Sequence, residues 1–145
     1  MIRMTSRAHR LVRALDGVVG DHGRVQQVDS ASPRIVILIV PAKGTGGVPI
    51  YLHLAGGEAI IRTGLAGRLA LAWGGTDDDE HICDVVAAIV AGDAVEYCVV
   101  DDRGDLHGYL AVRGTWGEYV PGAASHSHLH WRLPQWAPPI QVGAP

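Results

Sequence analysis

The sequence predicts an α+β fold, with a single domain in which two helices pack on one antiparallel sheet of about six strands. Apolar residues repeat at helical spacing near the N-terminus and again after residue 76, and short apolar segments separated by glycine and proline lie between these two stretches. The chain has 145 residues, of which 48% are hydrophobic, and this is enough to bury one packed core.

The first helix is expected over Ser6–Val19, with Thr5 or Ser6 as its cap. The residues that repeat at helical spacing are Ala8, Leu11, Val12, Leu15 and Val19. Its polar face carries Arg7, Arg10 and Arg13. A basic amphipathic helix can bind a membrane or nucleic acid, but in so short a helix arginines more often simply face water.

Five strands are expected between the helices, at Arg24–Val28, Arg34–Val40, Pro49–Leu54, Glu58–Thr63 and Arg68–Trp73. The second of these is apolar on both faces, which is typical of a strand covered on both sides or of a strand at a subunit interface. Ile35 and Ile37 are therefore candidate partner-contacting residues.

The second helix is expected to begin at Thr76 or Asp77 and to end before Gly92, since Asp77 to Glu80 complement its dipole. A hairpin follows, formed by strands at 94–100 and 106–112. The block Thr76 to Val100, together with the strand count, loosely resembles small secretion-chaperone-like domains. That resemblance implies a binding protein rather than an enzyme.

The composition changes after residue 120, so we expect an α+β domain at 1–120 and an extended C-terminal arm at 121–145. Trp131, Trp136, Pro138 and Pro139 could dock this arm into a groove of a partner, because tryptophan is frequent in binding hot spots and proline lowers the cost of ordering. The alternative is an arm that folds back on its own domain.

Three alternating histidines, His126, His128 and His130, are the main concentration of chemically useful side chains. In a strand they share one face, but they span roughly 13 Å, so two of them with a remote ligand are a more plausible zinc site than all three. His53, His107 or Glu118 could supply that remote ligand. The alternatives are adventitious nickel or copper binding, or a histidine-rich tail without a metal.

Several classes of function are disfavoured. The net charge of −3 gives no general attraction to nucleic acid or anionic lipid. Cys83 and Cys98 fit small packing residues in a reducing compartment better than a disulfide or metal motif. The loop Lys43–Gly47 does not match a phosphate-binding loop, and no nucleophile motif is visible. We therefore expect no cofactor other than a possible zinc ion, and no catalytic residue.

The sequence thus favours a small non-enzymatic protein-binding module, such as a chaperone-like protein, an immunity-type inhibitor, an adaptor or a phage-encoded component. Its partner would be another protein or a second copy, giving a homo-oligomer. The alternatives are a metal-binding protein or metallohydrolase using the histidine segment, and a virion or assembly protein. A high-GC bacterium or phage fits the composition, and the absence of a signal-like segment or apolar span predicts a cytoplasmic protein, or a virion protein if phage-encoded.

Overall fold

The computed structural model describes residues 2–28, 34–44, 46–64, 67–112 and 128–136. Its elements, in chain order, are α1 (Ile2–Val19), η1 (Gly20–His22), β1 (Gly23–Val28), β2 (Ile35–Pro41), β3 (Ile50–Ala55), β4 (Glu58–Thr63), β5 (Gly67–Ala72), α2 (Thr76–Val90), β6 (Ala94–Val100), β7 (Leu106–Val112) and β8 (His128–Arg132). The predicted α+β class is confirmed. In the described part of the chain, no helix is long and apolar enough to cross a membrane.

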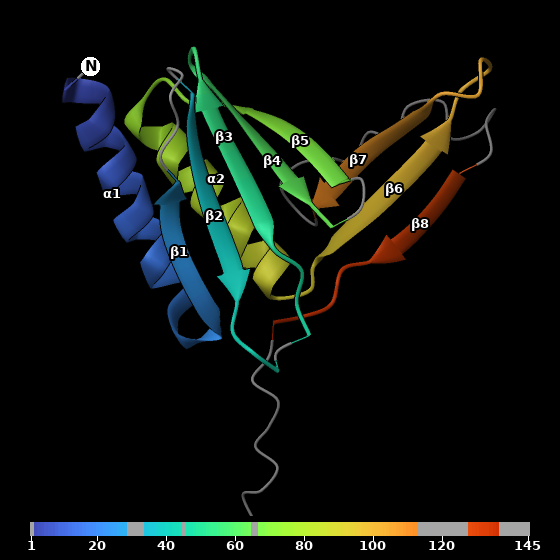
Figure 1. Ribbon diagram of the computed structural model, residues 1–145, viewed down its shortest axis with the longest axis horizontal. Coiled ribbons are helices and arrows are strands. Elements are labelled where there is room, and N and C mark those ends of the chain that lie inside the picture. Colours follow the sequence, from blue (N-terminus) through green and yellow to red (C-terminus); the bar gives the residue numbers. More distant parts are fainter. Residues whose placement is uncertain (1, 29–33, 45, 65–66, 113–127, 137–145) are drawn as a thin grey trace, which may run out of the picture.

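The strands form two antiparallel sheets, where the sequence predicted one of about six strands. The larger sheet is a five-strand meander in the order β1-β2-β3-β4-β5, and the smaller one has the order β7-β6-β8. β5 contacts β6 and β7, so the smaller sheet continues from the side of the larger one (Figure 1). The chain forms α2 between β5 and β6, and the strands before and after α2 belong to different sheets.

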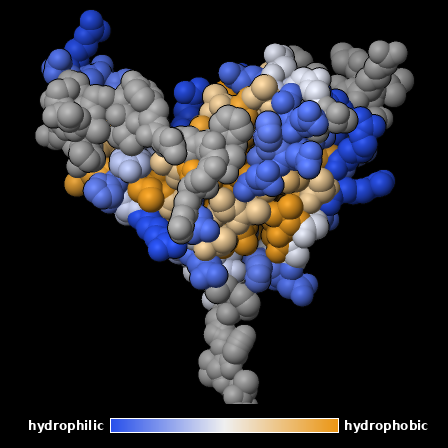
Figure 2. All heavy atoms as spheres, turned by 180° about the vertical axis from the view of Figure 1, so that it is seen from behind, coloured by the Kyte–Doolittle hydropathy of each residue, from blue (hydrophilic) through white to orange (hydrophobic). Residues whose placement is uncertain are grey.

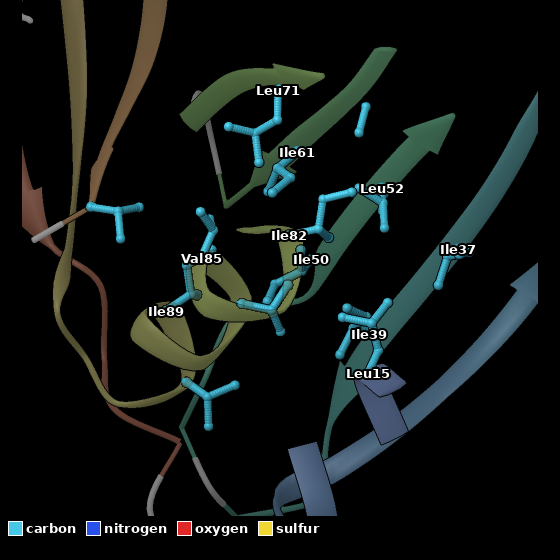
Figure 3. Packing of buried hydrophobic residues seen from close by; sticks show 14 of the residues in the cluster. Leu15, Ile37, Ile39, Ile50, Leu52, Ile61, Leu71, Ile82, Val85 and Ile89 are labelled. Carbon is cyan, nitrogen blue, oxygen red and sulfur yellow. The ribbon is translucent and has the colours of Figure 1, made fainter. Parts of the chain in front are cut away.

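Both helices cover the same face of the five-stranded sheet, and α2 lies behind β2 and β3 in Figure 1. The core forms where one face of α2 meets the inward-pointing residues of β2, β3 and β4 (Figure 3). These inward residues, all with 0% exposure, are Ile37, Ile39, Ile50, Leu52, Leu54, Ala59 and Ile61. On the helical side, hydrophobic and hydrophilic surface alternate (Figure 2).

The start of α2 is fixed by its own acidic residues and by α1. Gly75 is the N-cap and has no side chain, but Asp78 Oδ2 accepts hydrogen bonds from the backbone N–H groups of Gly74 (2.5 Å) and Gly75 (2.7 Å). These bonds lower the pKa of the Asp78 carboxyl group. Arg7 of α1 places its guanidinium 4.5 Å from the centre of the Trp73 ring and donates to the carbonyl of Gly75, so it ties the two helices together.

The end of α2 follows the sequence prediction. Gly92 has a φ of +80°, a conformation that favours glycine, and its N–H donates to the carbonyl of Ile89. The N–H of Asp93 donates to the carbonyl of Ala88. Together these bonds form a Schellman ending, which turns the chain directly into β6.

Part of the predicted arm lies in the domain itself. β8 pairs with β6 along its length, and Leu133 and Trp136 are buried at 2% and 0% exposure. The N–H of Leu133 donates to Ala94, and that of Trp136 donates to Val90. Residues 128–136 therefore complete the core, while 121–127 and 137–145 lie outside the described residues.

Candidate functional site

The outer face of the five-stranded sheet is the most distinctive surface of the described chain. Along β2, Ile37 and Ile39 point inward and are fully buried, whereas Val36, Leu38 and Val40 point outward and are half-buried. Neither helix covers these outward residues, because both lie on the opposite face. The strand is thus apolar on both faces, as expected, but only its inner face is packed by a helix.

The strand register defines two rows of side chains across this outer face. One row runs from Leu38 through Tyr51 and Arg62 to Arg68. The next row runs from Val36 through His53 and Ile60 to Ala70. The first row begins with Leu38 and Tyr51 and ends in two arginines. The second row is apolar except for His53. Apolar surface and positive charge are therefore neighbours on one face.

A pocket of about 370 Å³ opens where the positive charge gathers. Its lining residues are Arg34, His53, Ala55, Glu58, Ile60, Arg62 and Arg68. Among the described residues of this lining there are three arginines and one carboxylate, so they give the pocket a positive charge even though the chain carries a net charge of −3. Such a pocket can hold an anionic group, because guanidinium groups pair with carboxylates and phosphates in a planar, two-pronged geometry.

His53 reports the electrostatics of this pocket. Its pKa lies below the ordinary value, first because the ring is partly removed from water, and then because Arg62 and Arg34 repel a proton. Burial, assisted by the same charges that would attract an anion, therefore favours the neutral form of the ring. A negative group bound in the pocket would raise the pKa of His53.

The histidine segment lies elsewhere, on the smaller sheet. His126 is outside the described residues, and only the backbone position of His128 is described, in β8. The exposed His130 ring has its centroid 5.5 Å from that of Tyr97. The register places positions 107 and 128 on either side of Val99, in one row across β7, β6 and β8.

No metal centre is formed by the residues that the structure describes, among which no group of three or more histidine, cysteine or carboxylate side chains could hold an ion. His107 Nε2 lies 2.7 Å from Asp101 Oδ2, and this contact is the largest cause of the lowered pKa of Asp101. Of the other two proposed remote ligands, His53 belongs to the other sheet and Glu118 lies outside the described residues. The zinc site stays a prediction.

The two tryptophans of the predicted arm contact their own domain. Trp131 is partly buried, and its Nε1 donates to Glu96 Oε1 at 3.0 Å. Trp136 is completely buried, and a Cβ atom added to Gly47 would lie only 2.3 Å from its ring. Pro138 and Pro139 lie outside the described residues. Partner binding by this segment stays a prediction.

Of the two isoleucines predicted to contact a partner, Ile37 is fully buried in the core and Ile35 is packed against it. The outward residues Val36, Leu38 and Val40 are the ones that remain accessible. An unbroken apolar run does not reveal which alternate residues face the helices, so sequence reasoning missed them. Sequence reasoning also missed the pairing of Arg62 with Arg68, which depends on the register of the β4–β5 hairpin.

Cys83 is packed against the core, as expected for a small packing residue. Both cysteines are free thiols, Cys83 on α2 and Cys98 on β6. Burial and the nearby carboxylates of Asp79, Asp84 and Glu80 raise the pKa of Cys83 to about 11. A thiol with so high a pKa is a poor nucleophile and a poor metal ligand at neutral pH.

No protein-family model, no curated protein and no solved structure matches the chain.

Proposed function

We propose that this protein is a small non-enzymatic binding module that receives a partner protein on the outer face of its five-stranded sheet. The observation that supports this proposal is a set of half-buried apolar residues on that face that neither helix of the described chain covers, namely Val36, Leu38, Val40 and Ile60. Contiguous apolar surface beside polar residues is typical of protein interaction sites. Tyr51, at 43% exposure, adds an aromatic side chain of the kind common in binding hot spots.

The charge on this face favours a different protein over a second copy as the occupant. A symmetric dimer places the same patch of both subunits in contact. Here both subunits would bring a face on which the described charged residues are mainly arginines, so positive charge from both would accumulate in one interface. Chaperone-like, immunity-type and adaptor proteins all act by holding a partner, so each fits the proposal.

A photoreactive amino acid placed at Tyr51 tests the proposal in cells of the source organism. Ala87 provides the control, because it is exposed on α2, on the other side of the sheet. We expect a discrete cross-linked species from position 51 and none of the same mass from position 87. Identical products from both positions, or none from position 51, would overturn the proposal. A product of twice the chain mass would identify self-association instead.

The metal-binding alternative has its own test. Elemental analysis of untagged protein, and of a His130→Ala variant, measures bound zinc directly. Stoichiometric zinc that is lost in the variant would support a metalloprotein. The outer-face proposal predicts that the His130→Ala variant keeps the cross-link from position 51.

A further inference from the structure

The arginine pair on the outer face is unfavourable in the protein alone. Arg62 of β4 and Arg68 of β5 are direct partners in the strand register, and both side chains are exposed on the same face. Like charges directly opposite each other on neighbouring strands repel. Within the described residues, no salt bridge to a carboxylate offsets this repulsion for either arginine.

The other side chains that line the pocket also contribute to its electrostatic potential. Arg34 adds a further positive charge and His53 a neutral imidazole, and among the described lining residues only Glu58 is acidic. The lowered pKa of His53, caused in part by Arg62 and Arg34, agrees with a positive potential inside the pocket. A bound anion would relieve the repulsion between Arg62 and Arg68, so the site is arranged for an occupant that carries negative charge.

We propose that this pocket binds the carboxylate groups of an acidic, extended segment of the partner protein. The inference rests on the proposed function and specifies the partner's chemistry. The carboxylates enter between Arg62, Arg68 and Arg34, and the apolar side chains of the same segment lie against Tyr51 and Leu38. Leu38, Tyr51, Arg62 and Arg68 lie in one register row, so a single peptide can reach both the apolar and the basic side chains.

A peptide explains the composition of the pocket better than a free anion or a nucleic acid. Ile60 and Ala55 belong to the lining, and the apolar side chains of Tyr51 and Leu38 lie beside the pocket. Inorganic phosphate has no apolar group that could pack against these side chains. A nucleic-acid backbone would occupy the basic part of the face and leave Leu38 and Tyr51, in the same register row, without an apolar partner. An acidic peptide uses both the apolar and the basic parts of the face.

The test uses a synthetic peptide in which glutamate alternates with valine, and a matched peptide with glutamine in place of glutamate. Fluorescence anisotropy with the full-length protein measures both affinities. We expect the acidic peptide to bind and the neutral peptide to bind roughly tenfold more weakly or worse, as for a lost charge-assisted hydrogen bond. Equal binding of the two peptides would overturn the proposal.

Variants identify the pocket as the site. Arg62→Gln and Arg68→Gln should each weaken binding of the acidic peptide roughly tenfold. The control Arg10→Gln, on the exposed surface of α1, should leave the affinity unchanged. Arg68→Glu should weaken it further and favour a peptide in which lysine replaces glutamate. Because these substitutions reduce the repulsion between strands, the thermal unfolding midpoint should not fall.

The His53 ring provides a second readout that needs no mutation. In an NMR titration, the acidic peptide should raise the pKa of His53, because a negative group now lies beside the ring. Loss of peptide binding in Arg10→Gln equal to that in Arg68→Gln, or an unchanged pKa of His53 at saturation, would overturn the assignment of the site.

Two further ligands decide between sources of negative charge. If inorganic phosphate matched the peptide in affinity and displaced it, the pocket would be a small-anion site. If a single-stranded oligonucleotide bound more tightly than the peptide, the face would be a nucleic-acid site. Either result overturns the peptide proposal. A cross-link from position 51 that survives Arg68→Glu would refute this inference and leave the proposed function standing. Binding of the acidic peptide without any cross-link from position 51 would refute the proposed function, while showing that the pocket accepts an acidic peptide.

Discussion

Replacing Glu96 with alanine should strongly destabilise the protein, because this side chain joins the two sheets. Glu96 lies in β6 with 0% exposure. Its Oε2 accepts a hydrogen bond from Thr63 Oγ1 of β4 at 2.8 Å, and its Oε1 accepts one from Trp131 Nε1 of β8 at 3.0 Å. The substitution removes both acceptors at once.

The expected magnitude follows from these two bonds. A hydrogen bond to a carboxylate contributes about 1.5–3 kcal/mol, so the pair contributes about 3–6 kcal/mol. The Thr63 hydroxyl can rotate towards another acceptor, and the loss of a buried carboxylate removes its desolvation cost, so we expect a net loss of about 3–4 kcal/mol. That loss is a large part of the stability of a domain of this size, about 5–15 kcal/mol.

Urea unfolding followed by far-UV circular dichroism measures this loss. The exposed Asp16→Ala substitution on α1 is the control and should change the free energy of unfolding by about 0.5 kcal/mol or less. A double-mutant cycle with Thr63→Val should show a coupling energy of about 1 kcal/mol. A Glu96→Ala loss below about 1 kcal/mol, or no coupling to Thr63, would refute the role of Glu96 in joining the sheets.

Three further perturbations test packing and charge. Gly47→Ala should destabilise the fold by about 1–3 kcal/mol, measured by urea unfolding, because its Cβ would overlap the Trp136 ring; an unchanged midpoint would contradict this packing. Since the pKa of Asp78 is lowered in the folded state, its contribution to stability is complete above its ordinary value of 3.8 and is lost as the pH falls towards the lowered value. Asp78→Asn should therefore flatten this part of the stability–pH profile, and an unaltered profile would count against the capping role. In a Cys98→Ser variant, iodoacetamide at pH 8 should alkylate Cys83 far more slowly in the folded protein than in urea. A thiol with a pKa of about 11 is only roughly 0.1% thiolate at that pH. Equal alkylation rates in the folded and unfolded protein would disprove the raised pKa.

Local pattern predicted most individual elements well. β4, β6 and β7 have the predicted bounds, and Gly92 ends α2 as expected. These features depend on the periodicity of apolar residues, on turn residues and on helix capping, and each of these is determined by residues close together in the sequence. The doubly apolar character of β2 was also visible in the sequence.

The features that depend on distant pairing were not predictable in the same way. β8 pairs with β6 across more than twenty intervening residues, and it lies at the edge of the smaller sheet, where nearby prolines are tolerated. Proline content therefore indicated an arm where the chain forms a strand. The pocket likewise requires the register of β3, β4 and β5, because only that register brings Arg62 opposite Arg68.

The burial of Trp136 also bears on when the protein can fold during its synthesis. The ribosome makes the five-stranded sheet and both helices before it makes β8 and Trp136, which close the core beside Gly23 and Gly47. Until residue 136 has left the exit tunnel, the nascent chain carries an unfilled hollow and exposed apolar surface. Completion of the native core therefore waits for residue 136, and a ribosome stalled before this point would hold a chain prone to aggregation.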